Sequence, residues 1–162
     1  MRASYIYCIY FTIYIFIDTN IFIEYFESRI QFESVRKIFN ALEDERHIGF
    51  ISVGSFYTIA YIVDQGFKRK GLNKSERIDL VRSVLLKVLD LTEVIGANNE
   101  NLRKGIVDIQ FSDLEDSLQY QTALMEGCDI FITLNIKDFK GAEPNLIRVL
   151  TPQQFVEEFL EG

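Results

Sequence analysis

Short apolar runs that stop at polar residues constrain the fold of this chain most strongly. Residues 14–17 (YIFI) run directly into Asp18, and residues 128–133 (CDIFIT) hold a continuous apolar run bounded by polar residues. Runs without polar alternation are typical of strands that are buried on both faces. Further short strands are predicted at residues 47–52, 92–96 and 146–150.

The segments between these strands favour helices. Residues 32–45 carry apolar side chains at the spacing of one buried helical face. Residues 55–67 are interpreted as a buried helix that ends at Gly66. Because strands and helices largely alternate, we predict an α/β fold: a three-layer α/β/α sandwich with a central, mostly parallel sheet. Further helices are predicted over residues 20–28, 74–91, 98–109, 112–127 and 151–160.

Capping residues mark the starts of two of these helices. Ser112 and Glu115 have the S-x-x-E spacing of a capping box, which predicts that a helix begins at Ser112. Thr151 and Pro152 are typical of a helix cap followed by the first helical position. The second pair predicts a closing helix at the end of the chain.

Length and composition indicate one soluble domain. A chain of 162 residues, with 48% hydrophobic residues and no repeat or flexible linker, suits a single core. We predict a single domain over residues 13–162, preceded by an N-terminal extension at residues 1–12 to which we assign no role. The apolar run at residues 5–17 is shorter than the roughly 20 residues of a membrane-spanning helix, so no membrane location is expected.

The charged, sulfur-containing and histidine residues exclude several kinds of chemistry. The net charge of −7 argues against charge-driven binding to duplex nucleic acid. It suits a basic protein partner, and a divalent metal ion can still supply positive charge locally. Cys8 and Cys128 are too few for a disulfide framework or a thiolate zinc site, which indicates a reduced, cytoplasmic protein. Because His47 is the only histidine, most His-based catalysis is excluded.

Acidic and polar residues gather where the predicted strands end. In parallel α/β folds, ligands bind beyond the carboxyl ends of the strands. Asp18 directly follows one strand, while Asn135 and Asp138 follow another strand that ends at Thr133. Asp129 precedes that second strand, so we predict a structural role for it at the opposite edge.

Three further acids, Asp113, Glu115 and Asp116, open the helix predicted over residues 112–127, whose positive end favours anionic side chains. Each acid also has a structural explanation: Asp18 can cap a helix, and Glu115 can complete the capping box. Together on one edge, however, the acids would repel one another unless a cation lay among them. A donor set made only of oxygen indicates Mg²⁺ or Mn²⁺.

Two segments resemble the PIN-domain family. They are IDTN at residues 17–20 and EDSLQYQTALMEGCDIFITLNIKDF at residues 115–139. The likeness extends over residues 13–160, and LTPQQFVEEF at residues 150–159 is similar to the VapC-like toxins of toxin–antitoxin pairs. The resemblance implies a metal-dependent endoribonuclease that uses Mg or Mn, hydrolyses RNA and pairs with an antitoxin protein.

The resemblance also implies roles for individual residues. The acids that match the catalytic acids of the family are Asp18, Asp116 and Asp138. The candidate metal ligands are these three together with Glu115 and Asn135. The supporting polar residues are Thr19, Asn20 and Thr133, and the candidate RNA contacts are Lys137 and Lys140.

One departure from the family concerns the segment after the second strand. Family members usually carry a glutamate there, but residues 51–63 contain no acid, and the nearest polar residues are Ser52, Ser55 and Thr58. Glu115 or Asp113 is the candidate replacement. The alternative interpretation is a catalytically weak or inactive PIN-like module that binds a protein partner.

Two further features bear on partners. Residues 67–77 (FKRKGLNKSER) hold five basic residues, which either guide RNA or form a solvated loop. The content of 14 Phe and 8 Tyr exceeds what a small core needs. We therefore expect a homodimer, with residues 56–63 as a candidate contact surface.

Overall fold

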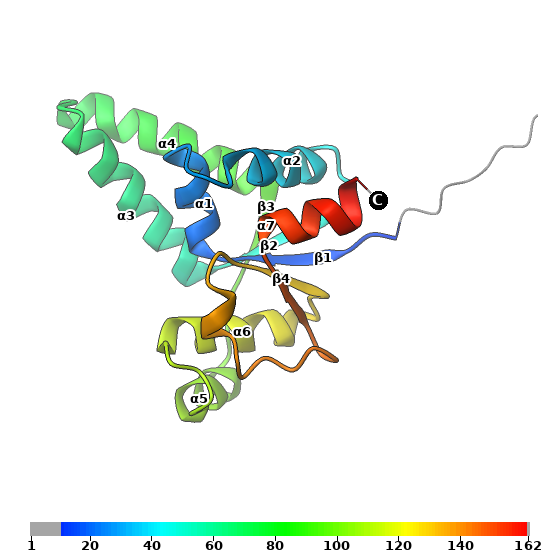
Figure 1. Ribbon diagram of the computed structural model, residues 1–162. Helices are drawn as coiled ribbons and strands as arrows, with labels where there is room; N and C mark the ends of the chain where they lie inside the picture. Colours follow the sequence, from blue (N-terminus) through cyan, green and yellow to red (C-terminus); the bar gives the residue numbers. More distant parts are fainter. Residues whose placement is uncertain (1–10, 162) are drawn as a thin grey trace, which may run out of the picture.

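The apolar runs form a five-stranded sheet in which every strand is parallel to its neighbours (Figure 1), which confirms the predicted α/β class. A computed structural model describes residues 11–161. The strand order is β3-β2-β1-β4-β5, so the first strand of the chain lies at the centre of the sheet. The strands are β1 (Tyr14–Ile17), β2 (Ile48–Ser52), β3 (Thr92–Ile95), β4 (Ile130–Ile132) and β5 (Arg148–Leu150).

Alternate residues of the central strands point into two separate cores. Ile15 and Ile17 of β1 belong to the larger core, whereas Phe16 between them belongs to the smaller one. β4 repeats the pattern: Phe131 faces the smaller core and stacks on Phe16, with the ring centroids 4.9 Å apart. Both faces of the sheet are therefore buried at its centre, which explains why these runs lack polar alternation.

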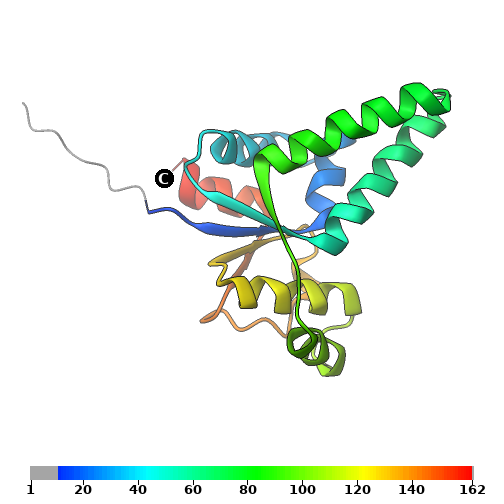
Figure 2. The ribbon, with the colours of Figure 1, turned by 180° about the vertical axis from the view of Figure 1, so that it is seen from behind.

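Helices cover both faces of the sheet, as the three-layer prediction requires (Figure 1 and Figure 2). On the larger core, α3 and α4 form a long hairpin that extends past the sheet. On the other face, α5 packs against α6 at Gly105, where a Cβ would lie 3.3 Å from the Leu118 Cα. The helices of the larger core are α1 (Thr19–Phe26), α2 (Phe32–Glu43), α3 (Val53–Arg69), α4 (Lys74–Leu91) and α7 (Pro152–Phe155), which continues as η2 (Val156–Leu160); those of the other face are α5 (Asn99–Val107) and α6 (Leu114–Glu126).

Helix α3 differs from its prediction in length and in burial. It continues through Gly66 to Arg69, because one helical glycine costs only about 1 kcal/mol relative to alanine. The chain turns instead at Gly71, which has a φ of +81°. Tyr57 and Tyr61 of α3 are 69% and 66% exposed, so the prediction of a buried helix is wrong for this face.

The start of α6 also differs from its prediction. Its N-cap is Asp113 rather than Ser112, and the Asp113 side chain accepts the N–H groups of Glu115 at 2.7 Å and Asp116 at 3.2 Å. A carboxylate accepts two backbone donors at a helix end more readily than the hydroxyl one residue earlier. The predicted start of the closing helix is confirmed, because Thr151 accepts the Gln154 N–H at 3.2 Å.

The prediction of an N-terminal extension concerns residues 1–12, of which residues 1–10 lie outside the described part of the chain. Residues 11–13 precede β1 without regular secondary structure. Between residues 11 and 161, the chain forms no helix with the length and apolar character needed to cross a membrane.

Candidate metal centre

Asp18 lies at the carboxyl edge of the sheet, directly after the central strand. Its N–H donates to the Ile132 carbonyl of β4 at 3.0 Å, so the backbone is still held in the sheet at this residue. Asp18 is 4% exposed. It occupies the N-cap position of α1, yet its side chain makes no capping hydrogen bond.

The Asp18 carboxylate is held by side chains instead. The Thr133 hydroxyl donates to Asp18 Oδ2 at 2.7 Å, and Asn20 Nδ2 donates to the same oxygen at 2.6 Å. Asn20 also accepts the Leu134 N–H at 3.3 Å, which ties the start of α1 to the end of β4. Burial raises the pKa of Asp18, while the Thr133 bond opposes that rise by favouring the ionised form.

Asp116 stands in the first turn of α6 and carries the clearest electrostatic signature. Burial, followed by the negative charges of neighbouring acids, raises its pKa to about 7. These neighbours are, in decreasing order of effect, Asp18, Asp113, Asp138 and Glu115. Asp18, which follows β1, and Asp138, in the turn after β4, thus both lie within electrostatic reach of Asp116.

The turn after β4 brings the remaining predicted ligands. Asp138 closes the short helix η1 (Ile136–Asp138) and is partly buried, while Asn135 is exposed. The Asn135 N–H donates to the Thr133 hydroxyl at 3.0 Å, so the same hydroxyl orders Asp18 and the start of this turn. Glu115 is exposed, and Asp113 uses its side chain as a helix cap.

Within residues 11–161, no three His, Cys, Asp or Glu side chains stand close enough together to hold a metal ion. The donor type, oxygen atoms only, is nevertheless the type that Mg²⁺ and Mn²⁺ prefer. None of the ion pairs found in this part of the chain involves Asp18, Asp116 or Asp138, so their repulsion is not relieved by a basic side chain. Beside Asp18, the buried Thr19 hydroxyl has no hydrogen-bond partner among the described residues.

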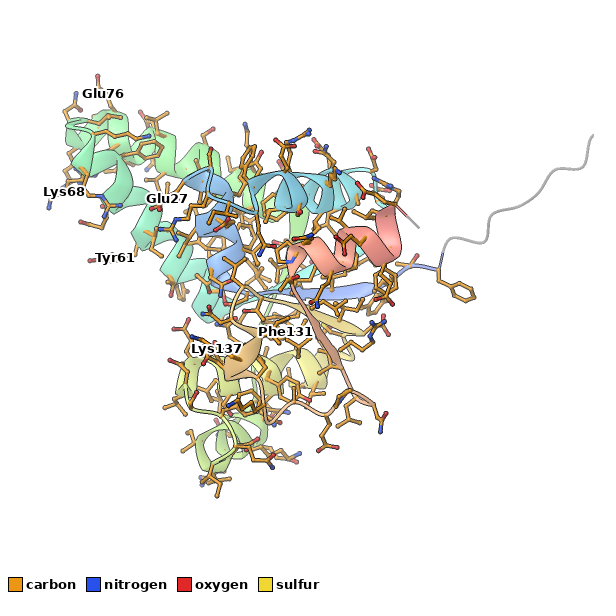
Figure 3. The ribbon with its side chains drawn as sticks, viewed as in Figure 1. Glu27, Tyr61, Lys68, Glu76, Phe131 and Lys137 are labelled. Atoms are coloured by element: carbon orange, nitrogen blue, oxygen red, sulfur yellow. The ribbon has the colours of Figure 1, made fainter. Side chains whose placement is uncertain are left out.

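The two candidate RNA-contacting lysines are exposed. Lys137 and Lys140 lie on and just after η1, and Figure 3 labels Lys137 at this turn. The basic segment at residues 67–77 is elsewhere: Lys68 lies toward the far end of the α3–α4 hairpin, away from Lys137. Within that segment, Arg77 pairs with Asp64. The segment therefore does not line the acidic edge.

Sequence reasoning missed a polar chain that leads from β2 to the acidic edge. Gln119 of α6 is 4% exposed, and its Nε2 donates to Glu115 at 3.3 Å. Its Oε1 accepts from the hydroxyl of Ser55, which is 1% exposed, at 3.4 Å. The spacing of four residues between Glu115 and Gln119 is a usable sequence signal. No local signal links either residue to Ser55, which is 64 positions away from Gln119.

Comparison with known proteins now defines the class of protein. Residues 14–137 match the PIN domain family, and the chain belongs to this family. Among curated proteins, the chain is 27% identical over 150 residues to Ribonuclease VapC1 of Aquifex aeolicus (strain VF5). The match covers 90% of this chain and 94% of that protein.

Solved structures share the fold. VapBC2 from Rickettsia felis, bound to a DNA fragment from its promoter, matches with a TM-score of 0.61 at 20% identity, covering 86% of this chain and 98% of that one. A toxin–antitoxin complex from Klebsiella pneumoniae matches with a TM-score of 0.57 at 23% identity, covering 85% and 96%. FitAB bound to the IR36 DNA fragment gives 0.58 at 17% identity, covering 85% and 94%.

Proposed function

We propose that this protein is a divalent-metal-dependent endoribonuclease that acts as the toxin of a toxin–antitoxin pair. One observation carries the proposal: in a PIN-domain chain, acids from separate elements meet at one sheet edge, where burial and then their mutual repulsion raise the pKa of Asp116 to about 7. A bound Mg²⁺ or Mn²⁺ ion would relieve that repulsion. The likeness to Ribonuclease VapC1 over most of both chains supports the same activity.

Three parts of the chain would hold the ion. Asp18 comes from the end of β1, Glu115 and Asp116 from the first turn of α6, and Asn135 and Asp138 from the turn after β4. A bound ion would supply Lewis acidity, polarising a phosphodiester of RNA and lowering the pKa of the attacking water. No side chain has to act as a nucleophile, which agrees with the absence of a histidine other than His47 from the sequence.

The protein's own groups prepare the site for this chemistry. Thr133 and Asn20 orient the Asp18 carboxylate and favour its charged form. Because its pKa is raised to about 7, the carboxyl group of Asp116 is partly protonated at neutral pH. Binding of a cation would release that proton. Lys137 and Lys140 are exposed and would contact RNA phosphates.

The proposal includes two protein partners. The solved structures with this fold include toxin–antitoxin complexes, which supports an antitoxin as one partner. The other is a second copy of the chain, since the exposed Tyr57 and Tyr61 of α3 offer aromatic surface of the kind found in interfaces. Light scattering at micromolar concentration tests the homodimer, and a monomer there would contradict it.

A second candidate function is an interaction module with weak or no catalysis. Two observations favour it: residues 51–63 lack the usual acid, and no three acids of residues 11–161 stand close enough to form a ready metal site. On this interpretation the fold binds a protein partner, and Asp18 serves only to connect α1 with β4.

The test of the first candidate is RNA cleavage with a matched pair of variants. The purified protein is incubated with a mixed RNA pool in Mg²⁺, in Mn²⁺ and in EDTA, beside Asp18→Asn and Asp129→Asn. Asp129 lies at the opposite edge of the sheet, where its Oδ2 accepts the Tyr14 N–H at 2.9 Å, so it controls for the loss of an aspartate next to a strand.

The expected result is cleavage that requires a divalent metal, disappears in Asp18→Asn and persists in Asp129→Asn. Because toxins of this kind can be narrow in target, Mn²⁺ binding is measured by calorimetry on the same samples. A folded protein that neither cleaves RNA nor binds Mn²⁺ would support the interaction module instead.

A further inference from the structure

A continuous chain of polar side chains connects the end of β2 with the first turn of α6. The Ser52 and Ser55 hydroxyl oxygens are 2.9 Å apart, and the Ser55 hydroxyl lies 3.4 Å from Gln119 Oε1. Gln119 Nε2 in turn donates to Glu115 Oε1 at 3.3 Å. We call these four residues the polar relay. It begins at Ser52, the last residue of β2, on the strand that neighbours β1 and Asp18.

Gln119 is the residue on which the polar relay depends. It is 4% exposed, and a buried amide lowers stability unless both its donor and its acceptor are bonded. Its Oε1 accepts a hydrogen bond from Ser55 of α3, and its Nε2 donates one to Glu115 of α6. An apolar residue would fill the same space without needing partners, so packing alone does not account for an amide here.

The polar relay reaches the acidic edge through Glu115. The negative charge of Glu115 raises the pKa of both Asp18 and Asp116, which shows that this exposed carboxylate lies within electrostatic reach of both acids. On its other side, the relay lines a cavity of about 290 Å³ whose walls include the apolar side chains of Ile95 and Leu102. Apolar surroundings strengthen hydrogen bonds, which helps to hold the Glu115 side chain in one direction.

We propose that Gln119 is a positioning residue: supported by Ser52 and Ser55, it holds Glu115 at the acidic edge, where Glu115 replaces the carboxylate that the segment after β2 lacks. This inference rests on the proposed function, because Glu115 then serves as a ligand of the divalent ion. It gives a role to the Ser55 hydroxyl, which helps to anchor a carboxylate from another helix. The Ser52 hydroxyl also caps α3, because it accepts the Ser55 N–H at 2.9 Å.

The experiment is a double-mutant cycle on Mn²⁺ affinity, measured by calorimetry with the full chain. The variants are Glu115→Gln, Gln119→Leu and the two combined. Thr122→Val is the matched control, because Thr122 lies on the same helix, is 3% exposed and lines the same cavity, but its hydroxyl donates to the Leu118 carbonyl of its own helix. Circular dichroism and thermal unfolding verify the fold of each variant.

Loss of a group that orients a metal ligand typically weakens metal binding about 10-fold or more. We expect Gln119→Leu to do so, Thr122→Val to leave the affinity within about 2-fold, and the double variant to bind no more weakly than Glu115→Gln alone. Ser55→Ala, which removes the relay bond from the other side, is expected to weaken binding by a smaller factor in the same direction.

Unchanged Mn²⁺ affinity in Gln119→Leu would overturn the inference. So would losses that add fully in the double variant, or an equal loss in Thr122→Val, because each points to a general effect on packing. Asp18→Asn distinguishes failure of the positioning role from failure of the proposed metal site. If this variant abolishes Mn²⁺ binding while Gln119→Leu does not weaken it, only the positioning role of Gln119 fails. If the native chain binds no Mn²⁺, the proposed function fails as well.

Discussion

The two edges of the sheet use an aspartate in opposite ways. Asp129 stands just before β4, is exposed, and accepts the Tyr14 N–H at the start of β1 at 2.9 Å. Asp18 stands just after β1, is 4% exposed, and is bonded by the side chains of Thr133 and Asn20. Both acids thus join the same two neighbouring strands, one at each end.

The difference follows from what surrounds each carboxylate. At the amino edge, Asp129 satisfies a backbone donor and has access to water, so its charge has little cost. At the carboxyl edge, Asp18 is buried and lies within reach of the charges of Glu115 and Asp116. The position of an acid relative to a strand therefore says more about its role than the residue type does, and each of the following predictions tests that contrast.

The largest expected effect is on catalysis. Asp18→Asn is expected to lower metal-dependent RNA cleavage by about 100-fold or more, since the charge that would face the metal is lost. Asp129→Asn should stay within about 2-fold of the native rate. Initial rates in Mn²⁺ on one RNA pool give both values. Equal losses of cleavage rate in the two variants would show that Asp18 and Asp129 do not differ in their importance for catalysis.

A second, smaller effect concerns the support of Asp18. Thr133→Val removes a hydroxyl that donates to a buried carboxylate, which should lower the free energy of unfolding by about 2 kcal/mol. Urea denaturation at pH 8 measures this change. Thr122→Val, whose hydroxyl bonds within its own helix, should lose less than about 1 kcal/mol. A Thr133→Val protein as stable as the native one would show that Asp18 does not need this bond.

The third prediction is a dependence of stability on pH in EDTA. The folded protein binds the Asp116 proton with a pKa of about 7, against an ordinary value of 3.8, so folding favours the protonated acid. The contribution of Asp116 to stability should therefore be greatest below about pH 4 and should be lost as pH rises through 7.

For a partly exposed group, solvent screening reduces this effect to about 1 kcal/mol, or roughly 3 °C in Tm. Thermal unfolding at pH 5 and pH 8 measures it. Asp116→Asn should flatten the fall between these two pH values, and saturating Mn²⁺ should raise the Tm of the native chain at pH 8 but not that of the variant. A native fall that persists unchanged in Asp116→Asn would assign it to another group.

The smallest expected effect is on stability and concerns Asp129, at the edge of the sheet where β4 begins. Asp129→Ala removes an exposed acceptor of the Tyr14 N–H and should lower the free energy of unfolding by about 0.5 to 1 kcal/mol. Unlike changes at Asp18, this loss should be the same in EDTA and in Mn²⁺. If this loss in the free energy of unfolding depended clearly on Mn²⁺, Asp129 would take part in metal binding, and the two edges of the sheet would no longer differ in function.

Much of the fold could be predicted because its signals are local. The first strand was predicted at residues 14–17 and lies at Tyr14–Ile17, since a strand buried on both faces needs an unbroken apolar run. The Thr151 cap was also recognisable, because it depends on neighbours within one turn. Errors arose where two local signals compete. Gly66 could have ended α3, and Ser112 could have capped α6, but the helix continued and Asp113 took the cap.

The candidate site also has features that local sequence predicts and features that it does not. By itself, the sequence determined which acids follow strands and open helices, because burial and capping depend on neighbouring residues. Only the tertiary structure decided which of them meet: Thr133 and Asp18 are 115 positions apart, and Ser55 and Gln119 are 64 apart. Such contacts depend on strand order and on how α6 packs against the sheet. No periodicity within a segment encodes them, since they form only when the whole core assembles.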